Sequence, residues 1–408
     1  MSLRCRLFAT HCLVWAVGCS AVHTQAVVDA GPSAGTCQPC IINGDCASSD
    51  TCSPLPAGCG GGRVCVSSAT PLAACVQQLG CSPPAGDAGP MLDAGAAPDA
   101  GDAPDAGPTP DGGMMPIGTL TADAGGTVPE LLFAVVGDTR PPLPNDDGAY
   151  PTPIITKIFS DIESLSPRVP IVIGTGDYQF TGLDLLSPAG SHQQTQLGAY
   201  NMARQQFSGV FWPAMGNHEC DSLGQDNCGP GTLASAGGDP ANYTVWFSLF
   251  ITPIGETTPY YSRTVSATDG SWSAKFIILA LNYWSDAQET WFASQLAGPS
   301  TTYTFVVHHE QNGASDGPPS LATVEGMEAG HETLSLVGHS HIWQFTGSQP
   351  QVIVGNGGAP LDASGNVYGF TLVSRQPDGS IQGTNYCSYG CAADAGPTPQ
   401  AVNQFNVP

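Results

Sequence analysis

Five short segments of the sequence carry side chains that could bind metal ions, and each follows a run of apolar residues. The segments are Gly137-Asp138, Gly176-Asp177, Gly216-Asn217-His218-Glu219, His308-His309 and Gly338-His339-Ser340-His341. They offer three oxygen ligands and three imidazoles, namely Asp138, Asp177, Asn217, His308, His339 and His341. This mixed set suits Zn, Mn or Fe better than Ca or Mg, which prefer oxygen ligands alone.

The spacing of the last two histidines indicates more than one metal. His339 and His341 are two residues apart, so on an extended strand end they point to opposite sides. A carboxylate between two metals could bridge them, and metals about 3.5–4 Å apart can activate a water and clamp a phosphoryl oxygen. We therefore expect two divalent or trivalent transition metal ions (Fe, Zn or Mn) and a small phosphorylated substrate.

The charge of the chain limits its partners. The 408 residues carry a formal net charge of −24, and no Lys/Arg cluster occurs after residue 6. Binding to nucleic acid requires neutralised phosphates, so this class of partner is excluded. A small anion would need a local positive centre, which bound metal could supply.

Strands and helices alternate around the five segments. Short apolar runs at 131–136, 170–174, 210–215, 303–307 and 333–337 predict buried strands before them. Helical spacing at 154–162 and a polar stretch at 195–208 predict intervening helices. Because open α/β sheets place their sites at the carboxyl ends of strands, the five segments should meet at one edge.

Composition divides the chain into five parts. We expect a lipoprotein-type signal peptide at 1–19, a Cys-rich module at 20–81, an Asp/Ala/Gly/Pro-rich disordered linker at 82–127, a folded domain at 128–391 and a disordered tail at 392–408. The linker repeats Asp every six residues from Asp87 to Asp111 and offers no apolar position for packing.

The N-terminal segment predicts export. Arg4 and Arg6 precede the apolar stretch 13–17, as in a secretory signal. Ala16-Val17-Gly18-Cys19 resembles a bacterial lipobox, in which Cys19 is acylated; an ordinary signal cleaved nearby is the alternative. We expect an outer-membrane lipoprotein of a bacterial cell envelope, touching the membrane only through that anchor, or an extracellular protein.

The mature cysteines occur in even groups. Eight lie in residues 37–81, which contain no His, and disulfides are favoured there over two zinc sites. Cys220 with Cys228 and Cys387 with Cys391 could each close a short loop, and cross-pairing of the four is also compatible with the sequence.

The five segments, in this order and spacing, resemble the calcineurin-like metallophosphoesterases over residues 130–375. Gly216–Glu219 and Gly355–Pro360 are most similar to the purple acid phosphatase branch. The resemblance implies an α/β fold, a four-layer α/β/β/α sandwich of two mixed sheets flanked by helices. It also implies one metal on Asp138, Asp177 and His341, and another on Asp177, Asn217, His308 and His339. His218 would contact the phosphate or assist the leaving group, and His309 would only neighbour the ligand His308.

Two positions depart from the family pattern. Arg140 stands where most of the superfamily has a histidine ligand, and Phe180 where the purple branch has a tyrosine ligand. The first metal position is therefore weaker, more open or empty. Arg140 could bind substrate phosphate through its fork of donors, or pair with Asp146 or Asp147 instead.

These features predict a secreted or lipid-anchored phosphoester hydrolase. By its resemblance to the purple branch it would be a phosphomonoesterase, with a binuclear metal centre and a metal-bound hydroxide as nucleophile. The alternative is a non-catalytic surface lipoprotein on a degenerate metallophosphoesterase scaffold.

Overall fold

The computed structural model describes residues 51–54, 63–66, 119–184, 186–220, 228–229, 240–347, 349–362, 366–391 and 398–408. The chain divides into two compact units, Met1–Pro104 and Asp105–Pro408. In the first unit, β1 (Thr51–Pro54) and β2 (Arg63–Val66) form an antiparallel hairpin that places Cys52 opposite Cys65. The predicted signal peptide, the lipobox at Cys19 and most of the predicted linker lie outside the described residues.

The second unit contains a six-stranded mixed sheet in the order β16-β15-β14-β5-β6-β7. Its parallel half is formed by β5 (Leu132–Val136), β6 (Ile171–Gly174) and β7 (Val210–Pro213). Its antiparallel half is formed by β14 (Tyr368–Arg375), β15 (Ile381–Tyr389) and β16 (Gln400–Val407). The parallel strands are short apolar runs, as expected for strands covered on both faces.

An eight-stranded mixed sheet packs against the first, in the order β12-β13-β11-β10-β9-β8-β4-β3. Its central strands are β9 (Ser273–Ile278), β10 (Tyr303–Val307), β11 (Leu334–Val337) and β13 (Gln351–Val354), with parallel neighbours. The outer strands are β3 (Leu120–Thr121), β4 (Gly125–Val128), β8 (Tyr261–Ala267) and β12 (Trp343–Thr346). The Phe133 ring meets those of Phe276 and Phe305 at centroid distances of 5.1 and 5.0 Å, which joins the sheets through an aromatic core.

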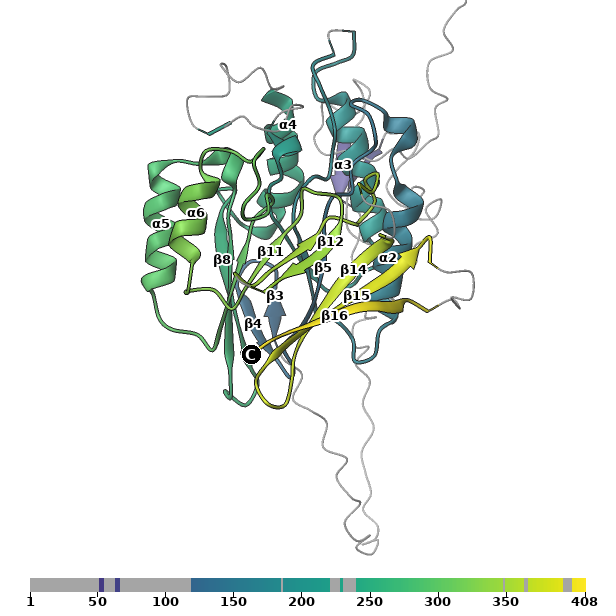
Figure 1. The fold of residues 1–408 in the computed structure, drawn as a ribbon. Coiled ribbons are helices and arrows are strands. Elements are labelled where there is room, and N and C mark those ends of the chain that lie inside the picture. Colours follow the sequence, from purple (N-terminus) through teal and green to yellow (C-terminus); the bar gives the residue numbers. More distant parts are fainter. Residues whose placement is uncertain are drawn as a thin grey trace, which may run out of the picture. The chain divides into compact units, whose positions relative to one another are not determined.

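Helices cover the outer face of each sheet (Figure 1). On one side lie α5 (Asp286–Ala297) and α6 (Leu321–Glu328), whose Phe292 and Val324 pack in one apolar cluster with Val306 of β10. On the other lie α2 (Thr152–Ser164) and α3 (Ser191–Arg204), with α2 packed on β14 and β15. The predicted four-layer α/β/β/α sandwich is therefore confirmed.

Shorter helical segments complete the described part of the unit. They are η2 (Asp147–Ala149), η3 (Asn217–Glu219), α4 (Pro240–Trp246), the π-helical η4 (Phe247–Ile251), η5 (Thr252–Ile254) and η6 (Leu281–Tyr283). Within the described residues, no helix combines the length and apolar character needed to cross a bilayer.

Both predicted ends of the folded domain need correction. Strand β3 and all of β4 except Val128 lie inside the predicted linker 82–127, and β4 pairs with β8. Strand β16 lies inside the predicted disordered tail 392–408, and its Phe405 ring stacks on Phe345 of β12 at 4.2 Å. The Gly- and Pro-rich composition around these strands hid the few apolar side chains that attach them to the sheets.

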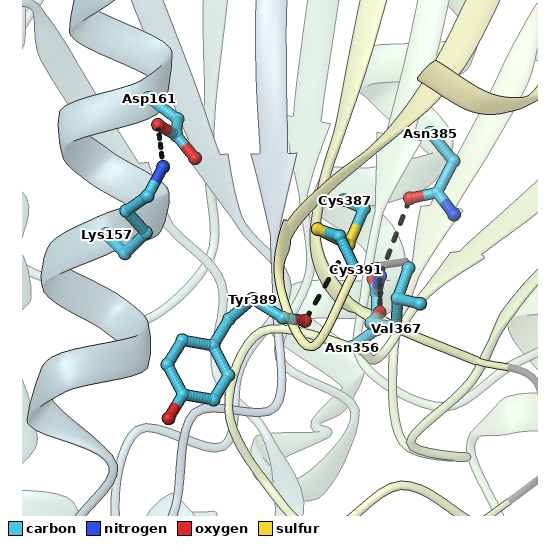
Figure 2. Close-up of a disulfide and its surroundings, with 8 residues drawn as sticks. All are labelled: Lys157, Asp161, Asn356, Val367, Asn385, Cys387, Tyr389 and Cys391. Carbon is cyan, nitrogen blue, oxygen red and sulfur yellow. Dashed lines mark hydrogen bonds and ion pairs between the residues drawn. A yellow bond between two sulfur atoms is a disulfide. The ribbon is translucent and has the colours of Figure 1, made fainter. Parts of the chain in front are cut away.

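One of the two predicted short disulfides is present. Cys387, within β15, is bonded to Cys391, just after this strand, beside the contact of Asn356 with Val367 and Asn385 (Figure 2). The pairing of Cys220 with Cys228 is not formed. Both of these side chains are buried thiols, and their sulfurs lie 3.6 and 3.3 Å from the carbonyl oxygen of Asn282.

Candidate metal centre

The two sheets supply opposite halves of the site. Asp138, Asp177 and Asn217 follow β5, β6 and β7, at the carboxyl ends of the parallel strands of the six-stranded sheet. The histidines come from the eight-stranded sheet: His309 follows β10, and His339 and His341 lie between β11 and β12. The predicted meeting of strand ends is therefore observed, across the junction of two sheets rather than along one.

The backbone at these strand ends turns sharply. Asp138, Asp177, His339 and His341 have φ of 56°, 58°, 72° and 49°, a left-handed conformation that is uncommon outside glycine. Residues held in this region often occur at functional sites, where the surrounding structure fixes them. Each of the four adopts it at the point where its side chain enters the site.

Two of the candidate ligands are preceded by a glycine that is required because another strand end lies very close to it. A Cβ at Gly216 would lie 2.4 Å from both the backbone nitrogen and Oδ1 of Asp177. A Cβ at Gly338 would lie 2.5 Å from Oδ2 of Asp138. Glycine at these positions lets one strand end lie directly against the ligand carried by another.

Asp138, Asp177 and His309 form the centre of the site. Their donor atoms lie within 4.8 Å of one another, and all three side chains are buried. His309 Nε2 lies 3.3 Å from Asp177 Oδ1 and 4.0 Å from Asp138 Oδ1, but has no hydrogen-bond partner. His309 Nδ1 donates to the carbonyl of Thr175 (2.8 Å), which orients Nε2 toward the carboxylates. This arrangement of two carboxylates and an unpartnered imidazole nitrogen fits a bound cation.

The electrostatics of this group also favour a cation. Despite burial, Asp177 and Asp138 raise the pKa of His309 well above its usual range. Despite burial, His309 and His218 hold the pKa of Asp177 well below its usual range. Burial raises the pKa of Asp138, with His309 and His341 opposing that shift. The paired carboxylates thus attract positive charge to the position that His309 faces.

His308 lies elsewhere, although the family resemblance implied that it was the ligand. Its Nδ1 contacts the carbonyl of Glu310 at 2.8 Å, and its Nε2 lies 3.6 Å from Glu328 Oε2 on α6. Its polar contacts are therefore with Glu310 and Glu328 rather than with Asp138 and Asp177, although Nε2 makes no hydrogen bond. The structure places the adjacent His309 beside the carboxylates instead.

Asn217, His339 and His341 surround the central group. Asn217 Oδ1 lies 3.1 Å from His339 Nδ1, and the rings of His339 and His309 are edge to face at 5.2 Å. His341 Nε2 lies on the other side, 3.6 Å from Asp138 Oδ1. Oxygen and imidazole donors thus extend to both sides of the Asp pair.

Arg140 reaches the site itself rather than Asp146 or Asp147. Its Nε lies 3.4 Å from Asp177 Oδ2, and its guanidinium carbon lies 4.5 Å above the Phe180 ring. The His218 ring packs on the same phenylalanine at 4.3 Å, with Nε2 3.7 Å from Asp177 Oδ2. Burial lowers the pKa of His218 to about 3, so this imidazole is neutral near pH 7. Both predicted catalytic side chains, His218 and Arg140, therefore lie beside Asp177.

Glu219 is a functional residue whose role the sequence did not reveal. Its buried carboxylate accepts hydrogen bonds from the backbone nitrogens of Asp177, Tyr178 and Gly216, at 2.9, 2.9 and 2.8 Å. Burial and the neighbouring Asp177 raise the pKa of Glu219 to about 8. The sequence signal that could have indicated this role is the position of Glu219 as the last residue of the motif Gly216–Glu219. The bonds fix the turn that presents Asp177.

No family model matches the chain. No curated protein matches it either. Among solved structures, one similar chain is a purple acid phosphatase from yellow lupin (Lupinus luteus) seeds, with TM-score 0.45 and 16% identity, covering 70% of this chain and 54% of that one. A second is GAP50, the anchor in the inner membrane complex of Plasmodium, with TM-score 0.43 and 14% identity, covering 68% and 89%. A third is a dimetal phosphatase from Danio rerio, with TM-score 0.41 and 11% identity, covering 69% and 99%.

The chain spans about half the length of the lupin protein. The similar structures include a purple acid phosphatase and a dimetal phosphatase.

Proposed function

We propose that this protein is a metal-dependent phosphoester hydrolase acting on phosphomonoesters. One observation carries the proposal: the buried group Asp138, Asp177 and His309 lies next to His218 and Arg140. A bound cation and two side chains able to contact an anion would then lie within one small site. An acidic chain needs such a local positive centre to bind phosphate.

The donor set suits a transition metal. Asp177, Asn217, His309 and His339 would hold an ion on one side of the Asp pair, with mixed oxygen and nitrogen ligands. When bound, a transition metal supplies Lewis acidity toward water and toward the phosphoryl oxygens. Thr175 keeps His309 in the tautomer that presents Nε2, and Glu219 holds the turn of Asp177.

The other side chains act on the substrate. Arg140 lies on Phe180 with a side chain only 15% exposed, so its charged fork is held in place for a phosphoryl group. His218 is neutral, and it would donate a hydrogen bond to the oxygen on which charge develops. These roles require no movement of the strand ends.

A panel of phosphate esters tests the proposal. The purified full-length mature chain, loaded with Mn²⁺ or Zn²⁺, should hydrolyse phosphomonoesters faster than diesters. Asp177→Asn should abolish the activity, whereas substitution of the exposed His331 by Gln should leave it unchanged. Absence of turnover on both ester classes would reject the catalytic proposal and leave a metal-binding scaffold, the alternative that the departures at Arg140 and Phe180 favour.

We also propose that the protein is a lipoprotein of the bacterial cell envelope, anchored through Cys19. The lipobox-like Ala16-Val17-Gly18-Cys19 supports this location. Cys19→Ser should move the protein from the membrane fraction to the soluble fraction. If the unsubstituted protein is already soluble and lacks an acyl group by mass spectrometry, the anchor is rejected.

A further inference from the structure

The two carboxylate oxygens of Asp177 have different surroundings. Oδ1 faces His309 Nε2 at 3.3 Å and accepts the backbone N–H of His218 at 3.1 Å. Oδ2 faces Arg140 Nε at 3.4 Å. The resemblance to metallophosphoesterases implied that Asp177 bridges two metals, but here a guanidinium lies against one of its oxygens.

Arg140 is held in that position from several sides. Its guanidinium lies over the Phe180 ring, its Nη1 donates to the carbonyl of Pro141 at 3.3 Å, and the side chain is mostly buried. The Phe180 ring is in turn packed on His218. Arg140 therefore places the delocalised charge of a guanidinium beside Asp177.

The remaining donors on this side are few. Asp138 and His341 contact each other at 3.6 Å, but a third ligand is missing within the described residues. Phe180 has no donor atom, and Tyr178 is buried in the core, where its ring stacks on Phe250 at 4.8 Å. A metal site normally has at least three protein ligands. Asp138 and His341 supply two, and the third candidate, Oδ2 of Asp177, already faces the guanidinium of Arg140. This set of donors does not fit a second ion.

The other side of Asp177 offers more donor atoms. Asp177 Oδ1 and His309 Nε2 face the same position, and the Asn217–His339 pair adjoins it through the edge-to-face contact of His339 with His309. We propose that the centre holds a single metal ion, bound by Asp177, Asn217, His309 and His339, and that the guanidinium of Arg140 replaces the second cation. This inference rests on the metal centre of the proposed function, but not on turnover.

Counting bound metal tests the inference. The full-length mature chain, stripped of metal and dialysed against Mn²⁺, should contain one ion per chain by elemental analysis. Mn²⁺ is the probe because cysteine sulfurs, such as those of Cys220 and Cys228, bind softer metals preferentially. The double variant Asp138→Asn/Asp177→Asn gives the background to be subtracted. The isolated ion should give a six-line electron paramagnetic resonance spectrum.

Restoring the two family ligands should restore the second ion. Arg140→His/Phe180→Tyr should bind two Mn²⁺ per chain, with the broadened spectrum of a coupled pair. Arg140→Gln, which removes the charge but keeps the length, should gain a second, weaker ion and serves if the double variant does not fold. Two ions of similar affinity in the unsubstituted protein would overturn the inference, as would one ion in every variant. The count is independent of hydrolysis, so an inactive protein with one ion would reject only the catalytic proposal.

Discussion

The adjacent histidines at the end of β10 give the sharpest test of the site. His309→Ala removes the nitrogen that faces Asp138 and Asp177, whereas His308→Ala removes the partner of Glu328. The two variants should therefore fail in different ways. The quantity to compare is the gain in unfolding free energy on adding Mn²⁺, measured by urea denaturation at one fixed free concentration.

The size of each effect follows from linkage. At a free metal concentration about 100 times the dissociation constant, the unsubstituted protein should gain about 2.7 kcal/mol. Loss of an outer-shell partner of a metal ligand already weakens binding by about 10–100-fold. If His309→Ala weakens binding by about 100-fold, the same metal concentration should stabilise it by only about 0.4 kcal/mol.

His308→Ala should keep the full gain of about 2.7 kcal/mol from the metal. It should instead lower the metal-free stability by about 3–5 kcal/mol, because removing one partner of a buried ion pair leaves the other buried without compensation. Among the described residues, Glu328 would retain Asn312 and Ser335 as hydrogen-bond donors. His331→Ala, at an exposed position, is the matched control and should change neither quantity by more than about 0.5 kcal/mol. Loss of the metal-dependent gain in His308→Ala with its retention in His309→Ala would refute the assignment.

Three further predictions test the scaffold around the site. Despite burial, hydrogen bonds to two aspartates raise the pKa of His192, so its stabilising contribution is complete below about pH 6.5 and is lost as the pH rises through the raised value. His192→Gln should therefore lower the melting temperature more at about pH 5.5 than at about pH 9. An equal loss at both pH values would contradict this sign. Phe405→Ala should lower the free energy of unfolding, measured by urea denaturation, by about 3–5 kcal/mol, because it removes the ring that joins β16 to β12. A decrease under about 1 kcal/mol would mean that β16 does not pack on β12. Gly216→Ala should displace Asp177 and remove most of the metal-dependent stabilisation, and normal metal affinity in this variant would disprove the required close approach.

Much of the site could be predicted because strand ends follow simple rules. Asp138, Asp177 and Asn217 each end a short apolar run, and parallel strands bring such ends to one edge. The glycines before the ligands were part of the same signal, since close packing of strand ends leaves no room for a side chain. The two-sheet fold was predicted from the order of the five motifs rather than from any one of them.

The rest depended on contacts that are distant in sequence. Which of His308 and His309 faces the site is decided partly by Glu328 on α6, about twenty residues later, so the apolar run before them carries no such information. The strand at Gln400–Val407 depends on the contact of Phe405 with Phe345. The local sequence around it, rich in Ala, Gly and Pro, resembled a disordered tail.

The origin of the ligands in both sheets has a consequence for how such a chain evolves. Asp177 and Asn217 follow strands of one sheet, and His309 and His339 follow strands of the other, so an ion bound by the proposed ligands would join the two layers. The same four residues would then contribute both to the stability of the fold and to the proposed chemistry. A variant without catalytic activity would still gain stability from the ion, so loss of activity alone would not remove the reason to keep its ligands.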